Sequence, residues 1–359
     1  MFDLATIKST DDLFAWYMPY ELKFIKPAGT SRGILTKKIS WFIFIKDKKN
    51  DHIGIGECGP LPGLSPELNE GLEEKLKQVI KEPQNWAYYL KEGLIDYPSI
   101  RFALEMALLD LQAGGRRILF DNDFTRSAKG IPINGLIWMG SAESMNEQFK
   151  KKIADGYACI KMKIGAIDFQ NEFDLLKKMR LKYDKKKIML RVDANGAFSD
   201  DCNEKLNQLA SLDIHSIEQP IKQGQISKMA SLCQSPPLDI ALDEELIGIN
   251  DLNPKEEFLE RIKPQYIIIK PSLLGGFEAS MEWITIAESK NIGWWITSAL
   301  ESNIGLNAIA QWTYELETQM HQGLGTGQLY TNNIDSPLYI KNGYLFFGNE
   351  NAWNLKPLM

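Results

Sequence analysis

The feature that most constrains this chain is a series of charged residues that recurs at the ends of short apolar segments. The series consists of Lys161, Lys163, Asp193, Glu218, Asp243 and Lys270. After Lys163 the successive intervals are 30, 25, 25 and 27 residues, and such an interval is about the length of one strand–helix unit. Charges at the carboxyl ends of successive strands are typical of the active-site face of a (β/α) barrel. The spacing therefore predicts a barrel with a catalytic site at its mouth.

Alternating strand-like and helix-like segments support the same architecture. Apolar or β-branched segments occur at 133–137, 158–162, 188–192, 214–217, 240–242, 266–269 and 294–296, with a weaker one at 321–324. Segments with helical periodicity lie between them, at 144–154, 169–182, 202–212, 225–232, 277–290 and 306–314. Because strands that alternate with helices form parallel sheets, about eight such units predict a closed barrel.

The first third of the chain has a different pattern. Residues 39–45 give a strong strand signal, and a polar turn leads to a predicted partner strand at 52–57. Helices are predicted at 67–82 and 99–111, so strands precede helices, as in a small α+β domain. Before the hairpin, the glycines and small polar residues of 27–33 predict a mobile loop.

These patterns divide the chain into three parts. We expect an α+β capping domain over residues 1–115 and a catalytic barrel over 116–328. The remaining residues, 329–359, contain a strand signal at 344–348, and we expect this segment to return to the first domain.

Composition narrows the classes of function. The 359 residues are 44% hydrophobic and 25% charged, with a net charge of −6 and no stripe of Lys and Arg with aromatic residues between, which argues against nucleic-acid binding. No segment of 18 apolar residues and no signal peptide is found, so we expect no membrane partner. The cysteines form no CxxC pair and are expected to be reduced thiols of a cytoplasmic protein: Cys58, Cys159, Cys202 and Cys233. The oligomeric state stays open.

Three carboxylates at strand ends point to a metal. Asp193, Glu218 and Asp243 would repel one another in the low dielectric of a barrel mouth, and a hard divalent cation would remove that repulsion. Magnesium prefers oxygen ligands and keeps open positions for water or substrate, so Mg²⁺ is expected, with Mn²⁺ as the alternative. A single acid after a strand is as readily a helix cap, but three at matched positions favour the metal site.

The lysines before and after these acids point to proton transfer. Strand alternation sends Lys161 and Lys163 to the same side, where each ammonium group favours loss of a proton from the other. Lys163, nearer the strand end, is the expected general base, and Lys161 the residue that orients a substrate carboxylate. Lys270 is expected on the far side of the carboxylates. Asn195 either supports Asp193 or only shapes the turn.

In these residues the chain resembles the enolase superfamily, in its muconate-lactonizing subgroup. That subgroup carries Lys-x-Lys on the second barrel strand, Asp, Glu and Asp on the next three and Lys on the sixth, a pattern that the present residues match one for one. The resemblance covers nearly the whole chain. It implies a modified (β/α)8 barrel of the (β/α)7β type with an N-terminal α+β capping domain.

Three loop segments, at 27–33, 297–305 and 323–328, resemble the o-succinylbenzoate synthase family of menaquinone biosynthesis. The reaction implied is a metal-dependent syn dehydration of the dicarboxylate 2-succinyl-6-hydroxy-2,4-cyclohexadiene-1-carboxylate to 2-succinylbenzoate. The ring carboxylate would bind magnesium, and Lys163 would remove the adjacent carbon-bound proton and return it to the leaving hydroxyl. Cationic Lys270 would stabilise the enediolate from the opposite face.

The same resemblance implies which loops hold the substrate. The segment Gly29–Arg32, which includes Thr30 and Ser31, is expected to close over the barrel mouth and exclude water. The succinyl tail is expected to contact this segment and four residues after the seventh strand: Ser298, Leu300, Glu301 and Ser302. Arg32 would attract the second carboxylate, although an exposed arginine without a partner is the alternative.

Other functions remain open on the same scaffold. An N-succinylamino acid racemase or a dipeptide epimerase would use Lys163 and Lys270 as acid and base on opposite faces. A dipeptide epimerase is expected to carry Asp-x-Asp after the seventh or eighth strand, whereas 297–303 contains only Glu301 and 323–327 contains no acid. The same loops disfavour a muconate-type cycloisomerase. A non-catalytic metal-stabilised binding protein is disfavoured because all six charged positions are intact.

Overall fold

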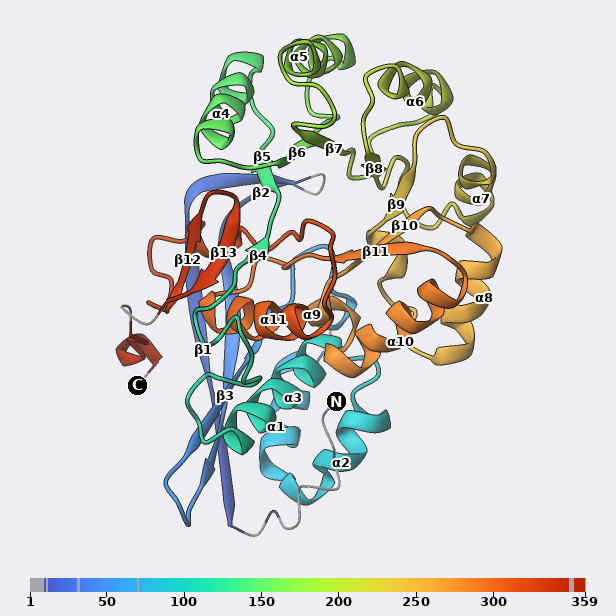
Figure 1. Cartoon of the computed structure of the whole chain (residues 1–359). Helices are drawn as coiled ribbons and strands as arrows, with labels where there is room; N and C mark the ends of the chain where they lie inside the picture. Colours follow the sequence, from blue (N-terminus) through green and yellow to red (C-terminus); the bar gives the residue numbers. More distant parts are fainter. Residues whose placement is uncertain (1–9, 11, 31–32, 70, 349–351, 359) are drawn as a thin grey trace.

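A long antiparallel sheet forms the first part of the chain. The structure, a computed structural model, describes residues 10, 12–30, 33–69, 71–348 and 352–358. Strands β1 (Leu13–Thr30), β2 (Gly33–Asp47) and β3 (Ile53–Cys58) lie in that order in the sheet, and β1 and β2 form the long ribbon in Figure 1. The predicted hairpin is confirmed, because β2 pairs with β3 from Trp41↔Cys58 to Lys46↔Ile53.

The loop predicted at 27–33 is wrong for most of its length. Strand β1 runs to Thr30, β2 begins at Gly33, and the two residues face each other in register. The pairing shifts between Lys23 and Ala28, where the intervening backbone turns instead to residues 329–331. Cross-strand pairing has therefore overridden the turn propensity of the glycines.

Helices cover one face of this sheet. The segment contains η2 (Pro66–Asn69), α1 (Leu72–Lys81), α2 (Trp86–Tyr88) and α3 (Pro98–Gln112), so both helices predicted here are present. Glycine allows α3 to approach β3 closely: a Cβ added at Gly56 would lie 1.8 Å from the carbonyl oxygen of Ala103. The helix therefore packs directly on the strand backbone.

A curved parallel sheet forms the second part (Figure 1). Its strands lie in sequence order and are β5 (Gly135–Ile137), β6 (Cys159–Lys163), β7 (Met189–Asp193), β8 (Ser216–Glu218), β9 (Ile240–Leu242), β10 (Tyr266–Ile269) and β11 (Gly293–Ile296). The predicted weak eighth strand is present only as backbone bridges, in which Gln322 pairs with Ile133 and Gly323 with Thr297. These bridges join the two edges of the sheet, so the fold is a modified (β/α)8 barrel.

Helices follow the barrel strands. They are α4 (Ala142–Ala154), α5 (Phe169–Lys182), α6 (Cys202–Ala210), α7 (Ile226–Gln234), α8 (Leu252–Ile262), α9 (Pro271–Leu274), α10 (Gly276–Ser289) and α11 (Asn303–Glu315). Helix α8 was not predicted, because its buried face carries Lys255 beside Leu259 and Ile262 and so lacks a full apolar stripe. The Lys255 ammonium lies inside and pairs with Glu282 at 2.5 Å.

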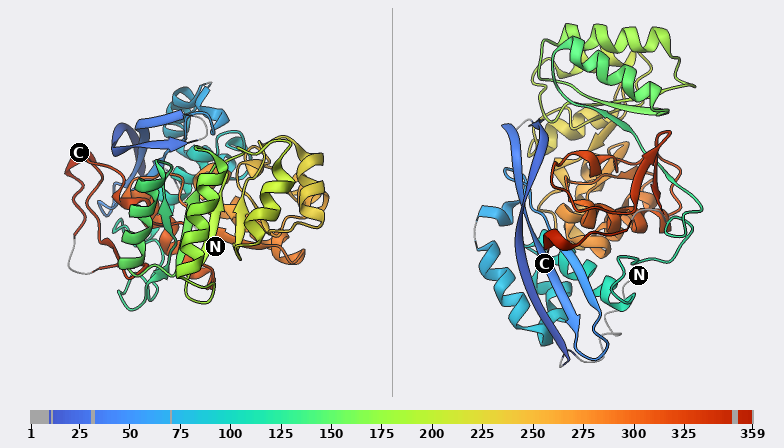
Figure 2. Two further views of the ribbon diagram at one scale, coloured as in Figure 1. Left: turned by 90° about the horizontal axis from the view of Figure 1, so that it is seen from above. Right: turned by 90° about the vertical axis from the view of Figure 1, so that its left-hand side faces the viewer.

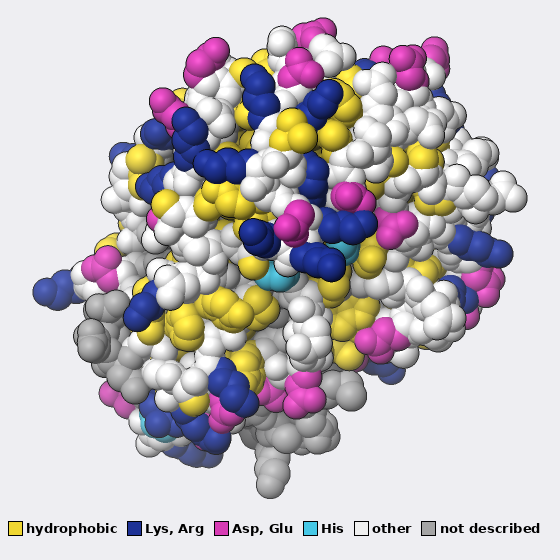
Figure 3. Space-filling model, turned by 45° about the horizontal axis from the view of Figure 1, so that its top comes forward, with side chains coloured by type: hydrophobic (Ala, Val, Ile, Leu, Met, Phe, Trp, Pro, Cys, Tyr) yellow, Lys and Arg dark blue, Asp and Glu magenta, His cyan; other side chains and the backbone are white. Residues whose placement is uncertain are grey.

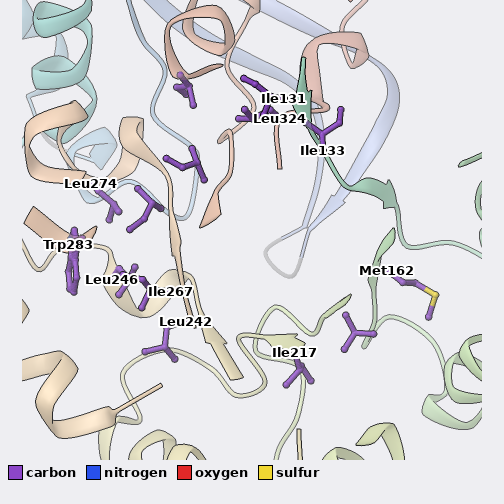
Figure 4. Close-up of a cluster of buried hydrophobic side chains, with 14 of the residues drawn as sticks. Ile131, Ile133, Met162, Ile217, Leu242, Leu246, Ile267, Leu274, Trp283 and Leu324 are labelled. Carbon is purple, nitrogen blue, oxygen red and sulfur yellow. The ribbon is translucent and has the colours of Figure 1, made fainter. Parts of the chain in front are cut away.

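Apolar residues on the strands separate the barrel from its helices. Ile217, Leu242 and Ile267 belong to the main hydrophobic cluster and are completely buried, as the close-up shows (Figure 4). Because successive side chains of a strand point to opposite faces, Ile217 lies in this apolar layer and its neighbour Glu218 lies on the opposite side of the strand. Burial of each such side chain contributes about 1.5–3 kcal/mol, so the packing fixes which side chains face the barrel interior.

The C-terminal segment contacts both parts of the molecule. Strands β12 (Leu338–Lys341) and β13 (Tyr344–Phe347) pair with each other, and β13 pairs with the short β4 (Ile131–Pro132). Residues 329–331 bond to the backbone of β1, through Thr331 N to Lys23 O and Ile25 N to Leu329 O. Figure 2 shows this segment beside the long ribbon of β1 and β2.

Candidate active site

Three carboxylates end neighbouring strands at one face of the barrel. Asp193 is the last residue of β7, Glu218 is the last of β8, and Asp243 directly follows β9. Asp193 and Glu218 are paired in the parallel register, so their side chains lie next to each other. All three are buried, with exposed fractions of 1%, 2% and 3%. The structure therefore brings the predicted acids together in a site largely shielded from water.

Lys161 lies between two of these acids. Its Nζ is 2.6 Å from Glu218 Oε2 and 3.2 Å from Asp193 Oδ2. Burial lowers the pKa of Lys161, but the adjacent Glu218 and Asp193 raise it by more than burial lowers it, so the pKa lies above its usual value. Lys161 is consequently a fixed cation, as expected for a residue that orients an anionic group.

Lys163 contacts one of the acids, an amide and an aromatic ring. Its Nζ is 3.2 Å from Asp193 Oδ2 and 2.6 Å from Asn195 Oδ1, and it lies 5.7 Å from the centre of the Trp138 ring. Asn195 also donates its backbone N–H to Asp193 Oδ1 at 3.1 Å. Of the two roles left open for Asn195, these contacts favour support of the site.

Lys270 lies on the other side of the carboxylates. Its strand, β10, is separated from β6 by the three strands that carry the acids. The Lys270 ammonium pairs with Asp243. Burial lowers the pKa of Lys270, and Asp243 raises it more, so this lysine too is held as a cation.

Neighbouring polar residues support the acids. Gln219, which has a positive φ of 42°, accepts a hydrogen bond from Asp243 N at 3.3 Å, and Glu244 accepts one from the Asn195 amide at 3.4 Å. Glu245 turns away and binds the backbone N–H of Gly224. Sequence reasoning missed Gln219 and Trp138, since neither follows the charge pattern, although Gln219 directly follows Glu218.

The substrate-loop residues occupy different environments. Gly29 and Thr30 belong to the end of β1, while Ser31 and Arg32 lie outside the described residues. After β11, the Ser298 hydroxyl is 2.6 Å from the hydroxyl of Thr326. The structure places the remaining three at the junction with the N-terminal sheet: Leu300, Glu301 and Ser302.

Comparisons with known proteins agree with this geometry. A family model described as "MenC, N-terminal domain" matches residues 12–111, and one described as "Enolase C-terminal domain-like" matches 144–349. The o-succinylbenzoate synthase of Desulfotalea psychrophila is 48% identical over 92% of this chain and 97% of its own length. The crystal structure of MenC from that organism has a TM-score of 0.83 at 43% identity, covering 94% of this chain and 100% of the other.

The chain belongs to the o-succinylbenzoate synthase family of the enolase superfamily. A more distant relative, the N-succinylamino acid racemase of Thermus thermophilus, is 27% identical over 77% of this chain and 75% of its own length. The predicted superfamily and family are therefore confirmed, as is the fold class.

Members of the enolase superfamily depend on a divalent metal, and the donor chemistry of this site fits one. Burial, followed by Asp193 and Asp243, raises the pKa of Glu218 to about 8. Burial also raises the pKa of Asp193, but Lys163 and Lys161 lower it more strongly. The acids therefore cannot all stay ionised without cations beside them, and a dication is a suitable cation for three carboxylate oxygens.

Lysines occupy the spaces between the acids in this structure. Among the residues that the structure describes, no three His, Cys, Asp or Glu side chains are grouped closely enough to hold a metal. The reason is visible in the contacts, since the Lys161 ammonium lies within hydrogen-bond distance of both Asp193 and Glu218. A dication bound between these two acids would require the Lys161 ammonium to move away from one or both of them.

Elsewhere the surface has mixed charge. On the face shown in Figure 3, Asp and Glu side chains lie among those of Lys and Arg. No helix within the described ranges is long and apolar enough to cross a membrane.

Proposed function

We propose that this chain is an o-succinylbenzoate synthase, which dehydrates 2-succinyl-6-hydroxy-2,4-cyclohexadiene-1-carboxylate to 2-succinylbenzoate. One observation carries the proposal: two lysines, Lys163 and Lys270, flank a buried row of three carboxylates at the strand ends. The 48% identity to an o-succinylbenzoate synthase over nearly the whole chain supports the choice of reaction.

Lys163 is the proposed base. As the free amine it takes the proton from the ring carbon next to the carboxylate, and the electrons of that C–H bond pass to the carboxylate, which becomes an enediolate. Those electrons then return to form a new double bond in the ring. The C–O bond of the ring hydroxyl then breaks, and Lys163 returns the proton to the departing oxygen, so that water leaves and the ring becomes aromatic. One residue on one face thus accounts for a syn elimination. Asn195 holds the amine through its 2.6 Å contact.

The other two lysines stay charged. Lys270, paired with Asp243, stabilises negative charge on the substrate from the face opposite Lys163. Lys161, between Asp193 and Glu218, orients the ring carboxylate. The raised pKa of each lysine, caused by the acids beside it against the effect of burial, supports these roles.

Asp193, Glu218 and Asp243 are the proposed ligands of Mg²⁺, for which Mn²⁺ is the alternative. When bound, the ion supplies Lewis-acid polarisation of the substrate carboxylate and so acidifies the adjacent carbon.

The succinyl tail is proposed to lie between the β1–β2 tip and the segment after β11. In support, Leu300 and Trp138 both pack against a hydrophobic cluster that contains Leu22 and Phe24 of β1, and the Trp138 ring centre lies 5.7 Å from Lys163 Nζ. The proposed partners are thus a small dicarboxylate and a metal ion. We propose a cytoplasmic location, which the four buried free cysteines support.

The test is a direct assay. Purified protein is supplied with the cyclohexadiene dicarboxylate and Mg²⁺, and the ultraviolet change on aromatisation is followed. N-succinyl amino acids are assayed in parallel by polarimetry, because Lys163 and Lys270 on opposite faces also suit racemisation. Dehydration that is lost in Lys163→Met supports the proposal. Racemisation without dehydration would show that the protein is a racemase and would contradict the proposed synthase function.

A further inference from the structure

Besides the candidate active site, a second group of buried polar residues lies between the N-terminal sheet and the barrel. The loop that follows Lys270 is hydrogen-bonded to this group. None of these side chains is more than 1% exposed, and α11 lies against β3 beside them (Figure 1). We call them the interdomain cluster: Lys38, Ser40, Glu57, Ser272, Glu301 and Ser302. The proton transfers of the proposed reaction use none of them, although two members, Glu301 and Ser302, were predicted to contact the succinyl tail.

Glu301 joins the loops after two barrel strands. Its Oε1 accepts a hydrogen bond from the Ser272 hydroxyl, and its Oε2 accepts one from Ala299 N at 2.7 Å. Ser272 is two residues after Lys270, and the carbonyl of Lys270 accepts bonds from Leu273 N and Leu274 N at 2.9 and 3.1 Å. Fixing Ser272 therefore fixes the short turn from which the Lys270 side chain extends.

The N-terminal sheet holds the other end of this connection. Lys38 Nζ donates to the carbonyl of Leu300 at 2.9 Å, and the Tyr330 hydroxyl donates to the same oxygen at 2.6 Å. Leu300 has a φ of 61°, which is unfavourable for a branched side chain. Such a conformation persists when the surroundings impose it, and here two donors on one carbonyl impose it.

Glu57 fixes the start of the following helix. Its carboxylate accepts bonds from Ser302 N at 2.9 Å and Gly305 N at 3.0 Å, at the N-terminus of α11. A negative charge is stabilised there by the free backbone N–H groups and the helix dipole. The segment 300–305 is thus attached to the sheet on both sides of Glu301.

The interdomain cluster is too closely packed to admit a ligand beside its charges. A Cβ added at Gly59 would lie 2.6 Å from Lys38 Nζ, and one added at Gly305 would lie 2.8 Å from Glu301 Cβ. Because Glu301 is enclosed and its oxygens are engaged by protein groups, its contribution is to geometry.

We propose that Glu301 is a positioning residue for Lys270, and that Lys38 holds the strained Leu300 backbone that presents Glu301. The N-terminal sheet thereby sets the position of the lysine on the far side of the site. The inference rests on the proposed function of Lys270.

Two serine variants test the proposal. Ser272→Ala removes the hydroxyl that links Glu301 to the Lys270 turn. Ser40→Ala is a matched control, because its hydroxyl also donates to a buried glutamate, Glu57, at 2.8 Å. We expect Ser272→Ala to lower kcat about tenfold or more with KM changed less than about threefold. Ser40→Ala is expected to keep kcat within about twofold, with similar thermal stability.

Substitution of Glu301 itself provides a rescue experiment. In Glu301→Gln the amide oxygen can accept from Ala299 N while its NH₂ donates to the Ser272 hydroxyl, so the connection survives. Glu301→Ala breaks it. We expect Glu301→Gln to retain most of kcat and Glu301→Ala to lose about as much as Ser272→Ala. Equal loss in both Glu301 variants would contradict a positioning role.

Crystal structures of the two serine variants separate this inference from the proposed reaction. We expect the Lys270 ammonium to be displaced in Ser272→Ala and unmoved in Ser40→Ala. If wild-type protein fails to dehydrate the substrate, the proposed function fails, but the displacement still decides the positioning role. An unmoved Lys270 in Ser272→Ala, or equal kcat in both serine variants, overturns the inference.

Discussion

Removal of the Asn195 side chain measures how much the geometry around Lys163 contributes to catalysis. Asn195 Oδ1 lies 2.6 Å from the Lys163 ammonium. A hydrogen bond to a charged donor contributes about 1.5–3 kcal/mol, and 1.36 kcal/mol corresponds to a tenfold change in rate. If the bond holds Lys163 for proton removal, its loss lowers kcat by about 10- to 150-fold.

The backbone of Asn195 decides which variants to compare. Its φ is 44°, in the left-handed region that glycine adopts freely and alanine adopts at a cost of about 1–2 kcal/mol. Asn195→Gly therefore deletes the side chain without strain, whereas Asn195→Ala deletes it with strain. We expect the two variants to share the same low kcat and Asn195→Ala to be the less stable by about 1 kcal/mol.

The assay is the ultraviolet change on aromatisation for kcat, with urea unfolding for stability. Asn195→Gly with kcat within about twofold of wild type would show that the contact has no catalytic role. A kcat that falls only in Asn195→Ala would assign the loss to backbone strain, and the reasoning would be wrong.

Four further outcomes are expected. Lys163→Met and Lys270→Met should each lower kcat by about 10²–10⁴-fold with the fold retained, as the ultraviolet assay and circular dichroism would report. Glu105→Ala should lower the free energy of unfolding by about 4 kcal/mol, because Phe277 N and Glu278 N lose a buried acceptor. The control Glu278→Gln alters an ion pair in which the glutamate is exposed, and it should cost less than about 1 kcal/mol; equal losses in urea would refute this difference. Burial, then Arg191 and His321, lower the pKa of His215 to about 4. His215 is thus neutral in the folded protein, and its contribution to the free energy of unfolding is fully present above the unfolded pKa of about 6.5. That contribution, about 2 kcal/mol after allowance for partial exposure, should be lost as pH falls from 6.5 towards 4 in wild type but not in His215→Phe. Chelation of metal should abolish dehydration and leave the circular dichroism spectrum unchanged, while metal at a hundredfold excess over its Kd should add about 2.7 kcal/mol of stability; unfolding by the chelator would contradict the role of lysines as counter-ions.

Much of the site was predictable because its residues follow a local rule. Each acid follows a short apolar segment, and parallel strands place their carboxyl ends at one face. Strand position alone therefore located Asp193, Glu218 and Asp243 together, 50 residues apart in sequence, without knowledge of any contact.

The remainder depends on contacts that no local pattern encodes. Glu301 and Ser302 looked like loop residues near the substrate because they follow β11. Their environment is set by Glu57 and Lys38, more than 240 residues earlier in the chain. A polar residue in a loop is predicted to be exposed unless the partner that buries it is known. Here the partners, Glu57 and Lys38, belong to the N-terminal sheet.

The pairing of lysines with acids explains how such a site folds at all. Three buried carboxylates would be strongly destabilising if left alone, since an unpaired buried charge costs several kcal/mol. Each has an ammonium group at hand: Lys161 contacts Asp193 and Glu218, Lys163 contacts Asp193, and Lys270 contacts Asp243. The lysines proposed to perform the chemistry are thus also the counter-ions that allow the acids to be buried without a metal. The same pairing makes each of these lysines sensitive to its acid, so a substitution at Asp193 or Asp243 is expected to disturb the adjacent lysine as well as the proposed metal binding.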